Sequence, residues 1–360
     1  MIITMVGAKN FAVPSGITRH VIEVSSILVE MGHEVHVILN SGDNGEKYEK
    51  YRGIHIHRIR HIQNKYINKI SMVPDLLSEL SLIDSDIIHA HDAVCGFAAQ
   101  KFSDQNFVYT IHGFGHINGN WPFFAKYPLQ MMEKKLVQDS SYVTAVDSTS
   151  LKIGKIWRKD IELIPNGVNI SLYLNKRDKP QEYLDDSLSI VFAGRLVETK
   201  GIEYLINTFN EKNSRLYILG SGPLEKKIEL MVRGRDNISL LGFKSDIIPY
   251  LQHADIFVLP SSFEGMPIAL LEAMAAETAC ISFDVGDLKE RFKDMEEICF
   301  TDTENFPKML HTIANNDELR NKIAMKANNC IKKEYSWDKV AHSYEKIYQK
   351  LIQQNIQNEA

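Results

Sequence analysis

The chain has 360 residues, which exceeds one typical domain and is enough for two. Hydrophobic residues make up 44% and charged residues 24%, a globular composition that argues against a disordered or fibrous chain. The net charge of −5 argues against a general nucleic-acid binder. The four cysteines are Cys95, Cys280, Cys299 and Cys330. They are not spaced like metal ligands and are too few to suggest a disulfide-rich fold, so we expect a reducing compartment.

The first ten residues lack the long apolar run of a signal peptide. No apolar stretch approaches the length of a membrane span. We therefore expect a cytoplasmic protein, or one attached peripherally to the inner membrane face.

Short apolar runs alternate with helical patterns along the first half of the chain. Val21, Val24 and Leu28 repeat at helical spacing within 17–31, and Gly32 ends that helix. Several apolar runs are too apolar to be half-exposed, so they suit a parallel sheet covered on both faces. The strands expected here are 2–7, 33–40, 54–60, 86–91, 107–113, 142–146 and 161–165.

Residues 169–188 are polar and lack clear periodicity, and we interpret them as the linker and its surroundings. Alternation of strands and helices on both sides of this stretch predicts two parallel, doubly wound α/β domains. Residues 336–352 form an amphipathic pattern with an apolar face that includes Tyr344 and Tyr348. The strands expected in the second half are 189–194, 215–220, 238–242, 255–260 and 279–283.

The most informative segment is 261–276, SSFEGMPIALLEAMAA, which directly follows an expected strand. Open α/β sheets bind ligands at the carboxyl ends of their strands. Gly265 lets the backbone approach a ligand, and Pro267 suits the first position of a helix. Good helix formers run from Ile268 to Ala276. The sequence therefore predicts a helix N-terminus whose free N–H groups can bind a diphosphate.

Two carboxylates flank this predicted anion site, Glu264 in the loop and Glu272 in the helix. A carboxylate beside an anion is costly unless it has another task, and accepting hydrogen bonds from sugar hydroxyls is a suitable one. Either glutamate alone could be an ordinary solvated residue. Together with the turn at Gly265, Met266 and Pro267, the pair favours a nucleotide-sugar site.

The segment resembles the E-x7-E signature of the retaining family 4 glycosyltransferases of the GT-B fold. The resemblance covers nearly the whole chain, and 336–348 is similar to the family's C-terminal helix, which packs on the N-terminal domain. It implies two Rossmann-like domains facing a central cleft, with 1–170 plus 336–360 on the acceptor side and 171–335 binding the donor. Other segments match in order: Pro-Ser-Gly-Ile at 14–17, HAHD at 89–92, TIHG at 110–113, IPNGVN at 164–169, FAGRLVETKG at 192–201, LGSGPLE at 219–225 and LGFKSD at 241–246.

The chain departs from the family pattern at three places. Ser15 replaces the first of two usual glycines, a usual glycine is missing near Glu277, and Gly286-Asp287 stands where the family has two glycines.

The resemblance implies that Glu264 holds donor-sugar hydroxyls and Glu272 the ribose. Arg195 and Lys200 follow a strand, where two cations would neutralise a leaving diphosphate. The expected catalytic residues are Glu264, Arg195, Lys200 and His112, which could hydrogen-bond a sugar hydroxyl. The expected donor-binding residues are Glu272, Gly265, Met266, Pro267, Ile268, Gly16, Gly222 and Phe243, of which Gly16 also shapes the acceptor side.

Two other patterns suggest metal ligands, but no metal site and no cofactor is predicted. His89 and His91 share one face of a strand end, where lining of the cleft or structural hydrogen bonding is favoured over a metal site. Asp84-Ser85-Asp86 matches the D-x-D pattern of the other major glycosyltransferase fold, but it precedes a strand and is interpreted as a strand-entry turn. His55, His57 and His61 are expected to be solvated.

Residues 119–137 combine aromatic side chains with lysines, including Lys126, Lys134 and Lys135. This mixture suits a membrane-interfacial segment or an acceptor loop. A loop and helix packed on the domain remain an equal alternative.

The sequence as a whole predicts transfer of a sugar from a nucleoside-diphosphate sugar to a saccharide, lipid-linked or small-molecule acceptor. Another GT-B enzyme, such as a nucleotide-sugar epimerase, is the nearer alternative, and the E-x7-E spacing counts against it. A dinucleotide-dependent oxidoreductase would need G-x-G-x-x-G after the first strand, which GAKNFAVPSG does not supply. A binding-only protein is disfavoured because both glutamates and both cations are present.

Overall fold

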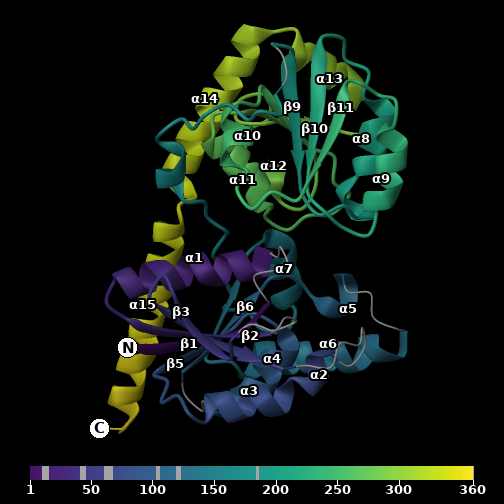
Figure 1. The fold of residues 1–360 in the computed structure, drawn as a ribbon. Helices are drawn as coiled ribbons and strands as arrows, with labels where there is room; N and C mark the ends of the chain where they lie inside the picture. Colours follow the sequence, from purple (N-terminus) through teal and green to yellow (C-terminus); the bar gives the residue numbers. More distant parts are fainter. Residues whose placement is uncertain are drawn as a thin grey trace. The chain divides into compact units, whose positions relative to one another are not determined.

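The computed structural model describes residues 1–9, 16–40, 46–60, 68–102, 106–118, 123–183 and 186–359. The chain divides into two compact units (Figure 1). Unit 1 contains Met1–Asn166 and Trp337–Ala360, and unit 2 contains Gly167–Ser336. The expected boundaries, 170 and 336, lie close to these divisions. The Pro14-Ser15 part of the predicted N-terminal loop, residues 119–122 and His61 lie outside the described residues.

The sheet of unit 1 has the order β3-β4-β2-β1-β5-β6-β7-β8. All its described pairings are parallel except the antiparallel pair of β3 and β4 at the edge. Strand order reverses between β1 and β5, as in a doubly wound sheet. The bounds are β1 (Ile2–Lys9), β2 (Glu34–Asn40), β3 (Tyr48–Tyr51), β4 (Ile54–Ile59), β5 (Ile87–Ala90), β6 (Phe107–Ile111), β7 (Tyr142–Ala145) and β8 (Glu162–Leu163).

Helices cover both faces of this sheet (Figure 1). On β5, Ile88 and Ala90 belong to the apolar cluster beneath α3, α4 and α6, whereas His89 between them contacts Tyr344 and Tyr348 of α15. This alternation follows from the two-residue period of a strand. The bounds are α1 (Gly16–Glu30), α2 (Asn68–Ser71), α3 (Val73–Leu80), α4 (Ala93–Ala99), η1 (Gln100–Phe102), α5 (Gly115–Asn118), α6 (Phe123–Asp139), α7 (Ser148–Gly154) and α15 (Trp337–Glu359).

The sheet of unit 2 has the order β11-β10-β9-β12-β13-β14, and its described pairings are all parallel. Strand order reverses between β9 and β12, so the crevice beyond their carboxyl ends is where a doubly wound sheet binds ligands. The bounds are β9 (Leu188–Ala193), β10 (Ser214–Leu219), β11 (Ile238–Gly242), β12 (Ile256–Leu259), β13 (Ala279–Phe283) and β14 (Cys299–Thr301).

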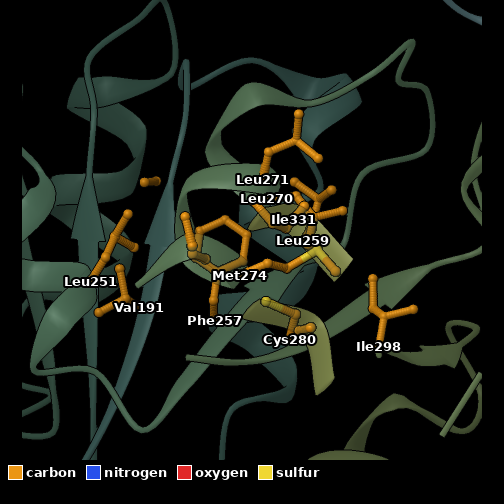
Figure 2. Close-up of a cluster of buried hydrophobic side chains, with 14 of the residues drawn as sticks. Val191, Leu251, Phe257, Leu259, Leu270, Leu271, Met274, Cys280, Ile298 and Ile331 are labelled. Atoms are coloured by element: carbon orange, nitrogen blue, oxygen red, sulfur yellow. The ribbon is translucent and has the colours of Figure 1, made fainter. Parts of the chain in front are cut away.

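Two apolar clusters sandwich the sheet of unit 2. Val191 and Phe257 point to the cluster beneath α11 and α14, which Figure 2 shows together with Leu270 and Met274. Ile190 points to the opposite cluster, beneath α8, α9 and α13. The bounds are η2 (Ile170–Tyr173), η3 (Glu198–Lys200), α8 (Ile202–Thr208), α9 (Glu225–Val232), α10 (Ile248–Gln252), α11 (Ile268–Ala275), α12 (Leu288–Arg291), α13 (Phe306–Ala314) and α14 (Asp317–Glu334).

The prediction of two doubly wound α/β domains is confirmed. The sequence analysis missed β3, a largely exposed edge strand of four residues, and β14, which has three. The helix expected from Pro267 begins one residue later, because Pro267 has the extended ψ of 109° and is the N-cap of α11. The D-x-D segment directly precedes β5, and Asp86 forms a bend whose Oδ2 accepts a hydrogen bond from the Ile2 N–H at 2.7 Å.

Candidate functional site

The site of unit 2 is built by the loops that follow β9, β10 and β12. The Ser262 N–H donates to the Thr199 carbonyl at 2.9 Å, which ties the loop after β12 to the loop after β9. The Leu196 N–H donates to the Ser221 carbonyl at 2.9 Å and ties the loops after β9 and β10 in the same way. The three loops therefore form one framework at the point where the strand order reverses.

Two glycines allow these loops to approach one another. Gly201 has a φ of +67°, and a Cβ there would lie 2.0 Å from the Pro260 carbonyl oxygen. A Cβ on Gly222 would lie 2.5 Å from the Leu196 carbonyl oxygen. Backbone atoms cannot yield like the end of a flexible side chain, so both positions require glycine in this arrangement. Gly222, expected near the nucleotide, therefore has a structural role within the framework.

Glu264 is held by two donors. Lys200 Nζ donates to Glu264 Oε1 at 2.5 Å, and Ser261 Oγ donates to the same oxygen at 2.7 Å. Glu264 is only 8% exposed and Ser261 is fully buried. Both described donors converge on Oε1, so Oε2 is the oxygen that can accept a hydrogen bond from a ligand. The structure thus brings two of the expected catalytic residues together.

Arg195 and the start of α11 belong to the same strand-end region of unit 2. Arg195 is exposed, so its guanidinium can reach a bound anion. Pro267 provides no side-chain cap for the N-terminus of α11, which leaves the first-turn N–H groups without that competitor. Gly265 is half-buried and Met266 is buried, and they connect Glu264 to this helix.

Glu272 lies within α11, and only 2% of it is exposed. Tyr173 Oη donates to Glu272 Oε1 at 3.3 Å. Tyr173 is the last residue of η2, which follows the expected linker start and belongs to unit 2. Phe243, expected to meet the base through its main chain, follows β11 and has an exposed side chain.

His112 directly follows β6 in unit 1 and belongs to a group of four histidines. His112 Nε2 lies 3.0 Å from His91 Nδ1, and its ring stands edge-on to the ring of His20 at 4.8 Å. Burial lowers the pKa of His20 to about 4 and holds the pKa values of His89, His91 and His112 well below their usual range. All four imidazoles are therefore neutral near pH 7.

Gly16 is the exposed first residue of α1, one turn before His20. The predicted sharing of one strand face by His89 and His91 is borne out by their ring centroids, 4.1 Å apart. The expectation that His57 is solvated is wrong, because His57 Nδ1 lies 3.2 Å from Glu79 Oε2 and His57 Nε2 lies 3.0 Å from His36 Nδ1.

Sequence reasoning missed four residues that hold the site residues. Ser261 donates a hydrogen bond to Glu264, and Tyr173 donates one to Glu272. The ring of His20 packs against that of His112, and Asn166 is hydrogen-bonded to His20. Ser261 was inside the quoted motif, but nothing in the sequence distinguished its buried hydroxyl from that of Ser262. The departure at Asp287 is accommodated by a helical ion pair, in which Arg291 Nε donates to Asp287 Oδ2 at 2.5 Å.

Helix α6 exposes one aromatic face. Phe123, Phe124 and Tyr127 are 92%, 80% and 69% exposed, whereas Leu136 and Val137 are buried in unit 1. The described part of 119–137 thus packs through its second half and leaves its aromatic residues exposed. Among the described residues, no helix has both the length and the apolar character needed to cross a membrane.

Two family profiles match the chain. The profile described as Glycosyltransferase Family 4 matches 14–172, and the profile described as Glycosyl transferases group 1 matches 187–316. An uncharacterised glycosyltransferase of Methanocaldococcus jannaschii is 29% identical, over 92% of this chain and 94% of its own. These matches do not favour the epimerase alternative.

Solved structures show the same fold. Sucrose-phosphate synthase from Thermosynechococcus elongatus superposes with a TM-score of 0.83 at 19% identity, covering 97% of this chain and 98% of its own. HepE of Anabaena, solved in complex with UDP-glucose, superposes with a TM-score of 0.80 at 16% identity, covering 97% and 100%. With two parallel-sheet α/β units, two glycosyltransferase profiles and relatives named as such enzymes, the protein is a glycosyltransferase with the GT-B fold.

Proposed function

We propose that the enzyme transfers a sugar from a nucleoside-diphosphate sugar bound in unit 2, with retention of anomeric configuration. The observation that carries this proposal is the Lys200–Glu264–Ser261 network at the reversal of strand order, beside a helix N-terminus without a side-chain cap. Retention rests on the resemblance in the E-x7-E segment. UDP-glucose is the first donor to test, because the Anabaena neighbour was solved with it.

Each group has a distinct task in this mechanism. Arg195, Lys200 and the N–H groups of α11 stabilise the diphosphate as negative charge develops on it. Glu264 Oε2 accepts a hydrogen bond from a donor-sugar hydroxyl and fixes the reacting carbon, while Glu272 holds the ribose. His112 and Gly16 contribute from unit 1, His112 towards a sugar hydroxyl and Gly16 on the acceptor side. A diphosphate oxygen takes the proton of the acceptor.

A thermal-shift and hydrolysis screen over nucleotide sugars tests the proposal. A ligand at 100 times its Kd stabilises the folded state by about 2.7 kcal/mol, which raises Tm by roughly 5–10 °C for a domain of this size. One nucleotide series should give this shift and slow hydrolysis. Glu272→Gln should reduce the shift, and Glu277→Gln, an exposed glutamate just beyond α11, should not. The same shift in Glu272→Gln as in wild type would contradict the assigned ribose contact.

We also propose that the exposed aromatic face of α6 contacts an anionic membrane surface. Its support is the exposure of Phe123, Phe124 and Tyr127 beside the lysines of the same helix. Reversing Lys126, Lys134 and Lys135 to glutamate should reduce co-sedimentation with phosphatidylserine liposomes. Reversing Lys326, Lys332 and Lys333 on α14 is the matched control. Lack of binding by the wild type would remove this contact.

A further inference from the structure

We propose that His20, His91 and His112 form a binding site for one Zn²⁺ ion or a similar late first-row divalent cation within unit 1. Each residue offers one ring nitrogen, and these three atoms lie within 4.8 Å of one another. His20 lies on α1, His91 follows β5 and His112 follows β6. The reversal of strand order between β1 and β5 collects these three chain segments, which are far apart in sequence.

The hydrogen bond of His20 leaves one of its nitrogens available to a metal. His20 Nδ1 lies 2.9 Å from Asn166 Oδ1. An amide oxygen only accepts hydrogen bonds, so Nδ1 carries the proton and Nε2 keeps its lone pair. His20 Nε2 is buried and has no hydrogen-bond partner among the described residues. A lone pair of this kind is what a metal ion requires.

His91 offers a second lone pair. Its Nδ1 shares one hydrogen bond with His112 Nε2 at 3.0 Å, and its Nε2 is buried without a partner in the described part of the chain. Buried N–H groups without a partner are rarer in proteins than buried acceptors without one. The favoured tautomer therefore has the proton on His91 Nδ1, which is donated to His112 Nε2, and the lone pair on His91 Nε2. His112 becomes a ligand when its ring turns and the lone pair of Nε2 exchanges this hydrogen bond for the metal. Neutral imidazole is the form that binds metals.

Neighbouring histidines do not share these features. His89 lies between the same elements, but its Nδ1 is 2.7 Å from Tyr348 Oη and its Nε2 is 2.7 Å from Thr110 Oγ1. Both His89 nitrogens are thus occupied by structural hydrogen bonds. The separate cluster of His36, His55 and His57 is bonded to Glu34, Tyr48 and Glu79. The unsatisfied buried nitrogens of His20 and His91 therefore distinguish this group from its neighbours among the described residues.

The geometry needs only small ring movements to bind zinc. Zn–N bonds of about 2.0–2.1 Å in a tetrahedron place the nitrogens about 3.3–3.4 Å apart. Spacings of up to 4.8 Å therefore have to shrink by roughly 1.5 Å, which side-chain rotations of three rings can share. Three imidazoles leave a fourth position for water, and this ligand set suits Zn²⁺, Cu²⁺ and Ni²⁺.

Occupation of this site would remove His112 from the contact with donor sugar. Zinc should therefore inhibit transfer, and this consequence rests on the proposed function. Binding of the metal itself does not, because its ligands and their hydrogen bonds stand independently of what His112 does in transfer.

Titration of the chelator-treated, full-length protein with Co²⁺ tests the site directly. We expect one equivalent to give the intense visible bands of tetrahedral cobalt, and one equivalent of Zn²⁺ to displace it. His20→Asn keeps an amide N–H near the position of Nδ1 and loses Nε2, and His91→Asn does the same. Each change should weaken Co²⁺ binding by at least about 100-fold, because loss of a residue that only hydrogen-bonds to a metal ligand already costs up to about 100-fold. His55→Asn, in the other histidine cluster, should bind like wild type.

Failure of the wild type to bind stoichiometric Co²⁺ would overturn the site, whatever the variants do. Wild-type affinity in His20→Asn, or loss of binding in His55→Asn, would overturn it too. In transfer assays, EDTA should leave activity intact, because Arg195, Lys200 and helix N–H groups replace a catalytic metal. One equivalent of Zn²⁺ should lower the transfer activity. One bound Zn²⁺ without inhibition would support the metal site and contradict the proposed role of His112.

Discussion

Lys200 Nζ lies 2.5 Å from Glu264 Oε1, although the two residues come from loops that follow different strands. The side chain of Glu264 is 9% exposed and that of Lys200 is 24% exposed, so water screens their interaction only in part. Ser261 Oγ donates to the same carboxylate oxygen. Lys200, expected to contact the diphosphate, and Glu264, expected to contact the sugar, are therefore hydrogen-bonded to each other.

A double-mutant cycle on the free energy of unfolding should show this coupling. Lys200→Met and Glu264→Gln should each destabilise the protein, since the first leaves a buried carboxylate and the second a half-buried ammonium group without its ion-pair partner. The double variant should lose less than the sum, with a coupling of about 1–3 kcal/mol. Urea titrations of the four proteins measure it.

The matched control is the pair Lys227 and Glu203, whose side chains are 58% and 28% exposed. Exposed pairs contribute about 0–1 kcal/mol, so the cycle on Lys227→Met and Glu203→Gln should be nearly additive. Equal coupling in both pairs would show that the buried position of Glu264 has no special effect.

Gly222→Ala should disrupt the framework through a steric clash. Its Cβ would lie 2.5 Å from the Leu196 carbonyl oxygen, which also accepts a hydrogen bond from the Leu224 N–H at 3.1 Å. Overpacking of this kind costs about 1–3 kcal/mol. We expect a lower urea midpoint together with weaker binding of nucleoside diphosphate, because the displaced loop also positions Arg195.

Gly234→Ala is the control for this change. Gly234 has a φ of +77°, but a Cβ there would meet nothing within 4 Å. Gly234→Ala should lower the free energy of unfolding by about 1 kcal/mol, because alanine disfavours a positive φ. Its nucleotide binding should equal that of the wild type. If Gly222→Ala binds nucleotide as well as Gly234→Ala does, the loop contact has no part in the site.

The candidate site could be predicted from the sequence where its residues lie close together in the chain. Glu264, Pro267 and Glu272 lie on one loop and helix, so their spacing could be interpreted directly. The sequence was insufficient where two distant segments meet. Tyr173 reaches Glu272 across 99 positions, and His20 approaches His91 across 71, distances that no local periodicity encodes. Strand β3 escaped prediction because an exposed edge strand lacks the apolar run of a buried one.

Thiol reactivity should depend on pH in a way that reflects burial. Burial raises the pKa of Cys330 to about 11 and of Cys299 to about 12, and it raises that of Cys280 well above its usual range. Only the thiolate reacts, so at about pH 8 the reactive fraction of Cys330 is roughly 0.1%, against about 10% for a thiol with a pKa of 9.

The rate of modification of native protein by a thiol reagent should therefore keep rising about tenfold per pH unit between about pH 8 and pH 10. Cys330→Ser should remove the fastest native component, because Cys330 is the one cysteine of the four that is not fully buried. In guanidinium chloride the thiols should react quickly. A native rate that levels off near pH 9 would contradict the raised pKa of Cys330.

The two glutamates should separate donor binding from transfer. Glu272 is proposed to hold the ribose, which is remote from the reacting bond. Glu272→Gln keeps the shape and weakens charge-assisted hydrogen bonds, which contribute roughly 1.5–3 kcal/mol each. Calorimetry should therefore show binding of free nucleoside diphosphate weakened by about one to two decades. Tyr173→Phe removes the hydrogen bond to Glu272 Oε1 and should weaken the same binding by a smaller factor.

Glu264 is proposed to touch the transferred sugar, so Glu264→Gln should leave the affinity for free nucleoside diphosphate nearly unchanged. Its single-turnover transfer rate should fall, because a sugar carbon that is not held in place loses its alignment with the acceptor. Two ordinary surface glutamates would affect neither quantity, and wild-type behaviour of both variants in both assays would refute the site. Loss of nucleoside diphosphate binding in Glu264→Gln alone would mean that the two roles are exchanged. That outcome would move the ribose to the carboxylate paired with Lys200 and the sugar to the one bonded by Tyr173.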